Sequence, residues 1–330
     1  MINKVLKQKI VFLDLLRSVA IICVLMGHFL ENNIYLNSFA DSGVDIFFVL
    51  SGYLVCKSLF ETENKPTQSV IIHFIKNRFL KIVPSYLVFF FLSIFIFTFV
   101  LPNIKQEIIP QIQEWRQYLM FYRNYGGPPA RLPYEHLWSI SAEIQFYGIL
   151  LISYLVLKNH KKVFLICWLS IAFISIFWKI QAQFTFLAEW PTYTHNRIDS
   201  FAWGIIAYLV PFKVKSNWQI VLPVLIIIFI SSIPLDIQIL HLYKRILIPV
   251  CMYFIINSFE NIKNHAIATT SQVIAKYSYN AYLWHFPIQF ICNELHFQQS
   301  ILIMLGITIA FSIVFTELVE IPFLKLKAKT

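Results

Sequence analysis

Residues 10–30 read IVFLDLLRSVAIICVLMGHFL, an apolar run that is interrupted by Asp14, Arg17 and His28. A helix that crosses a bilayer needs about 20 predominantly apolar residues, so this run predicts a membrane-spanning helix. A cleaved signal peptide has a shorter apolar region and ends in small residues at its cleavage site. This run is too long and lacks such a site, so we expect it to remain as the first span.

The composition of the chain also predicts a membrane protein. Of its 330 residues, 58% are hydrophobic and 13% are charged, and the mean hydropathy is +0.65. Soluble proteins carry about 25% charged residues, so an ordinary soluble domain is excluded. The formal net charge of +10 does not predict a nucleic-acid partner, because the basic residues are scattered between the apolar runs and do not gather on one face. The five cysteines lie in or beside apolar runs without a close pair, which predicts neither disulfides nor a metal site.

Nine further apolar runs follow the first. The ten predicted spans are 10–30, 44–60, 83–101, 134–156, 163–181, 198–212, 218–234, 244–259, 277–295 and 301–323. With the N-terminus in the cytoplasm, eighteen Lys and Arg residues lie on the cytoplasmic side and eight on the other, as the positive-inside rule requires. The eight are Lys105, Arg116, Arg123, Arg131, Lys179, Arg197, Lys244 and Arg245. The sequence predicts an all-α, polytopic integral membrane protein with about ten transmembrane helices and with both termini cytoplasmic.

Ionisable residues within spans mark functional sites by default, because burying them is costly. Arg17 and His28 are eleven residues apart, so they share a helical face, about 20° apart in azimuth and about 16 Å apart along the axis. Asp14 lies one turn before Arg17, which predicts an ion pair. A structural and a functional role fit this pair equally well. The imidazole of His28 is a candidate general base.

Two explanations are open for each of four residues in or near the second and third spans. Asp45 and Gly52 belong either to a site or to packing, as a carboxylate near a helix N-terminus and as a small residue that lets a neighbouring helix approach. Arg78 and Lys81 share a helical face, where they either bind phosphates or flank the third span as ordinary cytoplasmic charges.

The later spans add further candidates. Glu143, with Tyr147 at i+4 and His136 at i−7, predicts a polar side on one helix, and a buried Glu needs a partner or a proton. Arg197 and Asp199, at the start of the sixth span, predict a mutual ion pair.

The ninth span and the longest outside loop complete the set. In the ninth span, Pro287 comes two residues after His285, which is typical of a helix end. The loop 102–133 is rich in aromatic residues and contains Gly126-Gly127-Pro128-Pro129. It fits either a glycan-binding surface or an interfacial aromatic belt.

Six segments occur together in a fixed order. They are Arg17 followed after ten residues by His28, then SGVDIFFVLSGYL (42–54), RFLKIVPSY (78–86), HLWSISAEIQFY (136–147), RIDSFAWG (197–204) and SYNAYLWHFPI (278–288). In this order the chain resembles the acyltransferase family 3 membrane domain, and the likeness extends to FTELVEIPFLKLK (315–327). The family's first-helix Arg and His match Arg17 and His28. Its cytoplasmic basic pair matches Arg78 and Lys81, where Lys replaces the usual second Arg.

The resemblance implies an enzyme, an O-acyltransferase of the cell inner membrane. It moves an acyl group, most often acetyl from acetyl-CoA, to a sugar hydroxyl of a lipid-linked or surface polysaccharide. We expect a single domain over residues 1–330 without an appended soluble domain. Acyl-CoA is a donor substrate, and we expect neither a permanently bound cofactor nor a metal. The expected partners are the donor, the glycan acceptor and membrane lipid, with no nucleic acid.

The residues divide by expected role. Those expected to be catalytic are His28, Arg17 and Glu143. Those expected to bind acyl-CoA are Arg78 and Lys81. Those expected to bind or support substrate are Asp14, Asp45, Ser51, Tyr147, Arg197, Asp199, Ser278, Tyr282 and His285.

Two other classes of protein fit part of the sequence. The first is a proton-coupled transporter or a flippase of a lipid-linked intermediate, with a proton relay formed by Asp14, Arg17, Glu143 and His285. The second is a non-catalytic membrane scaffold. Transport tolerates removal of CoA, whereas the enzyme predicts glycan acylation that is lost in His28→Ala.

Overall fold

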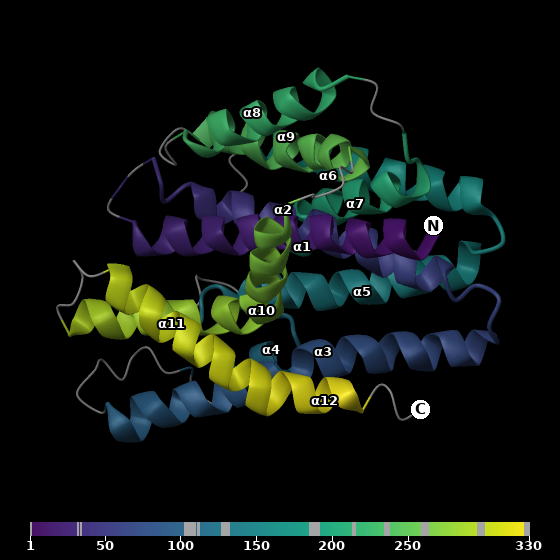
Figure 1. Ribbon diagram of the computed structural model, residues 1–330. Helices are drawn as coiled ribbons and strands as arrows, with labels where there is room; N and C mark the ends of the chain where they lie inside the picture. The colour runs from purple at the N-terminus through teal and green to yellow at the C-terminus, as the bar shows by residue number, and fades with distance from the viewer. Residues whose placement is uncertain are drawn as a thin grey trace. The chain divides into compact units, whose positions relative to one another are not determined.

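Every regular element that the structure describes is helical, as predicted (Figure 1). The computed structural model describes residues 2–31, 33, 35–101, 110, 113–126, 133–184, 192–212, 216–233, 238–258, 264–295 and 301–326. The α-helices are α1 (Ile2–Phe29), α2 (Phe39–Phe60), α3 (Thr67–Phe95), α4 (Trp115–Leu119), α5 (Leu137–Leu157), α6 (Lys161–Phe184), α7 (Ile198–Leu209), α8 (Trp218–Ser231), α9 (Gln238–Asn257), α10 (His265–Glu294), α11 (Ile301–Phe315) and α12 (Ile321–Lys325). The π-helices are η1 (Ile96–Val100) and η5 (Thr316–Glu320), and the 3₁₀ helices are η3 (Arg123–Tyr125) and η4 (Thr194–Asn196).

Six helical segments in the described ranges are long and apolar enough to cross a membrane. They are Ile10–Phe29, Phe39–Phe60, Thr67–Val100, Leu137–Leu157, Lys161–Gln181 and Ile301–Lys325. Helices α7 and α8 are apolar but shorter. Each of the ten predicted spans overlaps one or more helices of the described residues, so the protein is helical where the hydropathy indicated. The count of ten spans and the cytoplasmic position of the termini stay predictions.

Parts of two predictions lie outside the described residues. Of the motif Gly126-Gly127-Pro128-Pro129 in the loop 102–133, the residues Gly127, Pro128 and Pro129 are not described. Of the tally of basic residues, those not described include Lys105, Arg131, Lys213, Lys215, Lys263, Lys327 and Lys329.

Several helices extend beyond the apolar runs that predicted them. α2 begins at Phe39 and not at 44, and α3 begins at Thr67, directly after Pro66, and not at 83. Backbone hydrogen bonds form equally well in polar sequence, so hydropathy locates the membrane segment but not the start of the helix. The prediction that Pro287 ends a helix is wrong, because α10 continues through Pro287 to Glu294.

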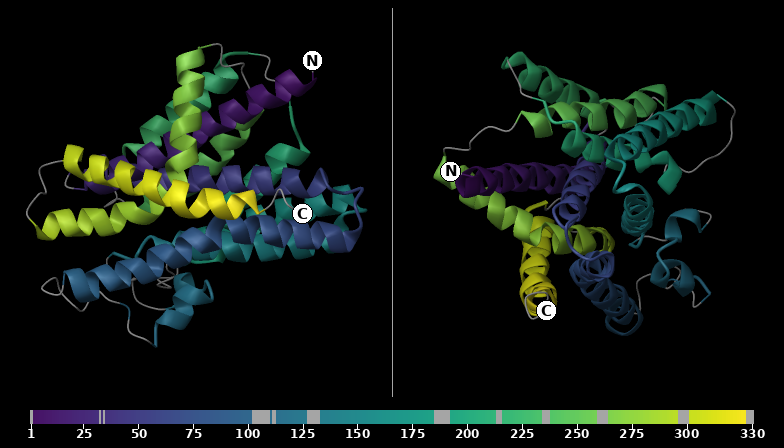
Figure 2. Two further views of the ribbon diagram at one scale, coloured as in Figure 1. Left: turned by 60° about the horizontal axis from the view of Figure 1, so that its bottom comes forward. Right: turned by 90° about the vertical axis from the view of Figure 1, so that its right-hand side faces the viewer.

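The helices group into two compact units. The first contains residues 1–63 and 142–275, and the second contains residues 64–141 and 276–330. In the first unit, α2 packs against both α1 and α7, and α9 packs against α7 and α8 (Figures 1 and 2). Apolar side chains from α1, α2, α7, α8 and α9 form its core, among them Leu16, Val49, Ala207, Ile230 and Met252.

Two glycines bring α2 and α7 into backbone contact. A Cβ atom added to Gly52 would lie 2.0 Å from the carbonyl oxygen of Phe201, and one added to Gly204 would lie 2.0 Å from that of Val49. Small residues let apolar helices approach closely where the surrounding lipid gives no hydrophobic drive to associate. The predicted packing role of Gly52 is therefore confirmed.

The second unit has an aromatic core. Helix α3 supplies Tyr86 and Phe90, whose rings stack on each other, and the Phe90 ring also packs with Tyr118 of α4. The Tyr86 hydroxyl donates to the Tyr118 carbonyl at 3.1 Å. In the C-terminal half of α10, Trp284 stacks on Phe315 with ring centroids 4.6 Å apart. Because the Tyr118 side chain is only 1% exposed, this loop residue belongs to the core and not to a glycan-binding surface.

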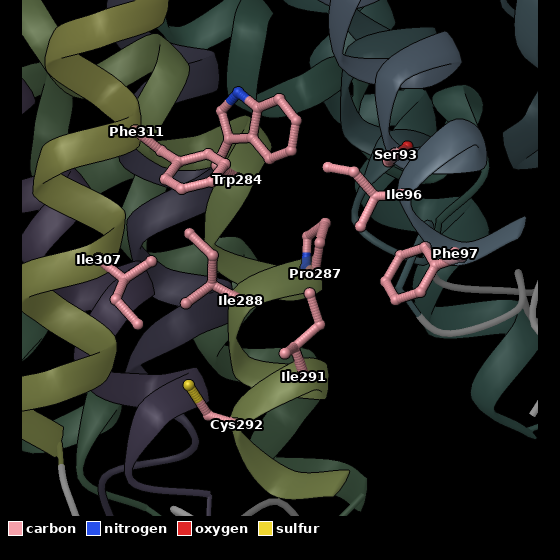
Figure 3. A pocket seen from close by; sticks show the side chains of 10 residues that line it. All are labelled: Ser93, Ile96, Phe97, Trp284, Pro287, Ile288, Ile291, Cys292, Ile307 and Phe311. Atoms are coloured by element: carbon pink, nitrogen blue, oxygen red, sulfur yellow. The ribbon is translucent and has the colours of Figure 1, made fainter. Parts of the chain in front are cut away.

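The same unit contains an apolar cavity of about 210 Å³ between α3 with η1, α10 and α11 (Figure 3). Its walls include Phe97, Trp284, Ile291 and Phe311, and its one hydroxyl, on Ser93, donates to the carbonyl of Phe90 at 3.0 Å. None of the described residues that line this cavity was given a site role from the sequence.

The contact between α2 and α7 predicts a difference between two glycine variants. We expect Gly52→Ala to lower the melting temperature, because the added methyl group meets backbone and costs about 1–3 kcal/mol. Gly148→Ala is the control, since nothing lies within 4 Å of its added Cβ. Thermal unfolding of both variants in detergent, monitored by the loss of the folded peak in size-exclusion chromatography, checks this. Equal melting temperatures would contradict the close contact.

Candidate functional site

The first helix carries an ion pair in a partly exposed position. The Arg17 guanidinium donates from Nη1 to Asp14 Oδ1 at 3.3 Å, and the two side chains are 40% and 15% exposed. The predicted pair is confirmed. Arg17 and His28 lie in one uninterrupted helix, α1, so the helical spacing that placed them on a common face applies. The pair thus offers a reachable cation on a helix that also carries an imidazole.

The start of α2 brings a carboxylate close to His28. Gly27 of α1 lies so near α2 that a Cβ atom added to it would be 2.4 Å from the backbone nitrogen of Ala40. His28 follows Gly27 and Asp41 follows Ala40, and the Asp41 carboxylate lies within electrostatic range of the imidazole. The sequence reading missed Asp41. Its signal is an acidic residue in the first turn of a helix, where the helix dipole favours it.

A buried ion pair joins α2 to the start of α7. Arg197 donates from Nη1 to Asp45 Oδ1 at 3.0 Å, and the Ser200 hydroxyl donates to the same oxygen at 3.1 Å. The side chains of Asp45 and Arg197 are 0% and 1% exposed. Because α2 starts at Phe39, Asp45 is not at the helix N-terminus, and its charge is balanced by Arg197.

The predicted pairing of Arg197 with Asp199 is wrong, because each of the two has another hydrogen-bonded partner. Lys179 of α6 donates to Asp199 Oδ2 at 2.7 Å, and both side chains are buried. Residues two apart at the start of a helix point in different directions, so Arg197 and Asp199 turn toward different elements. Lys179 was counted as a flanking charge, and its burial corrects that interpretation.

Helix α9 adds two more cations to this group. Arg245 donates to Asp41 Oδ2 at 3.1 Å, and Lys244, which is 1% exposed, donates to the carbonyl of Ser38. Both were counted as flanking charges, and Lys244 is in fact buried. We define the buried charge network as three carboxylates and four cations on α2, α6, α9 and at the start of α7, of which five are buried and two, Asp41 and Arg245, are partly exposed. Its members are Asp41, Asp45, Asp199, Lys179, Arg197, Lys244 and Arg245.

Helix α5 presents a second polar group to α2. The Ser51 hydroxyl donates to Glu143 Oε1 at 2.6 Å, and the Tyr147 hydroxyl donates to the same oxygen and lies 3.1 Å from the Ser51 hydroxyl. The predicted i, i+4 relation of Glu143 and Tyr147 is confirmed. The helical relation to His136 is wrong, because α5 begins at Leu137 and His136 precedes it.

In the second unit, the polar residues of α10 form a buried cluster. The Tyr282 hydroxyl lies 2.6 Å from that of Ser139, and His285 Nδ1 lies 2.6 Å from the Tyr282 carbonyl oxygen. The His285 ring is 5.2 Å from that of His136, centroid to centroid. Ser278 is also buried.

One member of the basic pair of α3 has a carboxylate partner that the sequence did not predict. Arg78 and Lys81 share α3 as expected, and the Arg78 guanidinium carbon lies 5.9 Å from the centre of the Phe74 ring. Lys81 forms an ion pair with Glu320 of η5, a residue that the sequence reading assigned no role. The signal for Glu320 was available, since it is a carboxylate inside the last apolar run.

The predicted site residues fall into two groups. Those in the first unit are Asp14, Arg17, His28, Asp45, Ser51, Glu143, Tyr147, Arg197 and Asp199. Those in the second unit are Arg78, Lys81, Ser278, Tyr282 and His285. Lys276, which begins the second unit's part of α10, donates to Glu317 at 2.5 Å, and this hydrogen bond raises the pKa of Lys276.

The buried charge network predicts a large loss of stability when one partner is neutralised. Asp45→Asn removes the carboxylate that accepts the hydrogen bond of Arg197 and leaves Arg197 only the more distant Asp41, 3.9 Å away. Breaking comparable buried pairs costs about 3–5 kcal/mol. The control is Glu63→Gln, whose pair with Lys161 is exposed on both sides and is worth about 0–1 kcal/mol. The yield of folded protein and its melting temperature in detergent check this. Similar decreases in yield and melting temperature in both variants would show that the buried Asp45–Arg197 pair stabilises the protein no more than an exposed pair does.

Comparison with known proteins places this arrangement of residues in a family. The family model described as "Acyltransferase domain" matches residues 10–317. The O-acetyltransferase OatA of Staphylococcus aureus strain NCTC 8325 is 28% identical over 333 aligned positions, which cover 88% of this chain and 52% of that protein. The putative O-acetyltransferase SACOL0978 of S. aureus strain COL is 26% identical over 351 positions, covering 95% of this chain and 57% of that protein.

The chain spans about half the length of the curated relatives it matches. No solved structure matches it. The family match extends over nearly all of the helices that carry Arg17, His28, Arg78 and Glu143, and it confirms the resemblance seen in the sequence motifs. This chain belongs to acyltransferase family 3.

Proposed function

We propose that this chain is a membrane O-acetyltransferase that moves an acetyl group from acetyl-CoA to a sugar hydroxyl of a lipid-linked or surface polysaccharide. The observation that carries the proposal is that α1 bears both an accessible cation, Arg17, and an imidazole, His28, inside the region that matches the family. The Arg17 side chain is 40% exposed, so a ligand can reach it even though it forms an ion pair with Asp14. The relatives named O-acetyltransferases support the choice of acetyl and of a hydroxyl acceptor.

In this proposal, Arg78 binds the donor. CoA carries several phosphates, and a guanidinium binds phosphate through two parallel hydrogen bonds. Arg78 is partly exposed on α3, so a soluble ligand can reach it. Lys81 contributes a second positive charge, and its ammonium also forms an ion pair with Glu320.

His28 handles the proton of the acceptor. It removes the hydroxyl proton while the hydroxyl oxygen attacks the carbonyl carbon of the thioester. The new C–O bond forms, the C–S bond breaks, and the proton returns to the departing CoA thiolate. A tyrosine hydroxyl stabilises the negative charge that gathers on the carbonyl oxygen. Arg17 lies about 16 Å from His28 along α1 and is paired with Asp14, so in this proposal its guanidinium acts on another part of the substrates.

A covalent relay is the alternative order of the same steps. The imidazole of His28 first displaces CoA to form an acyl-imidazole, and the sugar hydroxyl then takes the acyl group. Direct transfer predicts no acylated protein when the donor is present without acceptor, and the relay predicts one. Rapid mixing with labelled acetyl-CoA followed by peptide mass spectrometry separates the two orders.

The remaining polar groups suit the acceptor. Glu143, Ser51 and Tyr147 hold hydroxyl and carboxylate groups within hydrogen-bonding distance of one another on α2 and α5, and such groups bind sugar hydroxyls. The proposal places the protein in the inner membrane with ten spans and cytoplasmic termini, because the donor is made in the cytoplasm and the basic residues favour that side.

Removal of His28 should abolish acylation of the glycan. We expect the wild type to add the mass of acetyl groups to the host's surface polysaccharide, and both the gene deletion and His28→Ala, at equal membrane level, to lack them. Mass spectrometry of purified glycans checks this. An unchanged glycan in all three strains would refute a surface-glycan acceptor and favour the transporter or a small-molecule acceptor.

Removal of Arg78 should weaken donor binding. We expect Arg78→Ala to raise the KM for acetyl-CoA about 10-fold or more with a smaller effect on kcat, because it removes charge-assisted hydrogen bonds worth about 1.5–3 kcal/mol. The control is Lys65→Ala, an exposed lysine just before α3. Steady-state release of the CoA thiol, measured at several salt concentrations, checks this. An equal KM in both variants would remove Arg78 from the donor site.

A further inference from the structure

One of the two cations on α3 is already bound to a carboxylate. The Lys81 ammonium pairs with Glu320 Oε1, and the two side chains differ in accessibility, because Lys81 is 40% exposed and Glu320 is 2% exposed. A buried carboxylate cannot move into water cheaply, whereas a lysine has a flexible four-carbon stem. The ammonium is therefore the partner that can leave the pair.

Glu320 is held in place by further contacts. Asn280 of α10 donates from Nδ2 to Glu320 Oε2 at 2.9 Å and lies at the same distance from the Thr316 hydroxyl. Asn280 and Thr316 are 0% and 1% exposed. Both carboxylate oxygens thus have a donor, one from Lys81 and one from Asn280. If Lys81 left, the Asn280 hydrogen bond would remain.

The surroundings of Lys81 leave it near Arg78. Its ammonium lies 5.9 Å from the centre of the Tyr279 ring, and the Tyr279 hydroxyl donates to the Ile82 carbonyl at 2.9 Å, which ties α10 to α3. Residues three apart on a helix are neighbours on its surface. A ligand bound at Arg78 is therefore within reach of Lys81 once the ammonium turns from Glu320.

We propose that Glu320 is a specificity-determining residue that competes with the donor's phosphates for the Lys81 ammonium. The proposal rests on the donor-binding role given above to Arg78 and Lys81. Without donor, the Glu320 carboxylate neutralises Lys81. A ligand with several phosphates, such as CoA, carries enough negative charge to draw the ammonium away, whereas a weakly charged anion does not. Donor affinity is thus set below the value that an unpaired lysine would give.

Removing the competing carboxylate should tighten CoA binding. We expect Glu320→Gln in the purified chain to lower the Kd for CoA roughly three- to tenfold, the equivalent of one charge-assisted contact. Isothermal titration calorimetry with CoA in lipid nanodiscs measures this. The double variant Lys81→Met/Glu320→Gln should lose the gain, because the ammonium is then absent. An unchanged or raised Kd in folded Glu320→Gln would overturn the proposal, and so would a gain that survives in the double variant.

The chain offers a matched control and a second test. Glu317→Gln removes a carboxylate from the same π-helix, but its partner is Lys276, and both side chains are 43% exposed. We expect it to leave the Kd for CoA unchanged. Glu320→Asp keeps the charge but shortens the reach to Lys81, so it should also tighten CoA binding if Glu320→Gln does not fold. An unchanged Kd in folded Glu320→Asp would then overturn the proposal.

Failure of the proposed function gives a different pattern. If wild type binds CoA and Arg78→Ala weakens that binding, the donor site stands, and the result for Glu320 is decided separately. If wild type shows no CoA binding, the donor site and the competition at Lys81 are refuted together.

Discussion

Charged side chains are tolerated among apolar helices only when each is paired, and this requirement organises the first unit. Asp45, which is fully buried, needs Arg197, and Asp199 in turn needs Lys179. The pairs join α2, α6 and α7 at one end, and Arg245 with Asp41 extends the connection to α9. These helices share few features in sequence, but their charges can be buried only if the helices meet in this arrangement.

Close backbone contact makes this pairing geometrically possible. Gly52 and Gly204 let α2 and α7 approach until backbone touches backbone, so the short side chain of Asp45 reaches Arg197 across the interface. Gly27 acts in the same way between α1 and α2 and brings the start of α2, with Asp41, close to His28. The glycines and the charges therefore depend on one another.

Two cations combine pairing with accessibility. Arg17 and Lys81 are each 40% exposed, and their carboxylate partners Asp14 and Glu320 are 15% and 2% exposed. Stability asks that a charge near apolar surroundings be balanced, whereas binding of an anionic substrate asks that the cation be reachable. A half-exposed cation beside a more deeply buried carboxylate meets both requirements. The fully buried Arg197 meets only the first, which suits a structural part of the network.

The helical class, the positions of the apolar runs and the Asp14–Arg17 pair follow from the amino-acid sequence, because they depend on local hydropathy and on residues within one turn of a helix. The sequence also identified the family, because the motifs are local in sequence. The packing of the helices was needed to show that Arg197 pairs with Asp45 and not with Asp199, that Lys179 and Lys244 are buried, and that Lys81 pairs with Glu320. Partners 20 to 239 residues apart are brought together by helix packing, and no local pattern of residues specifies which charge a buried side chain will meet.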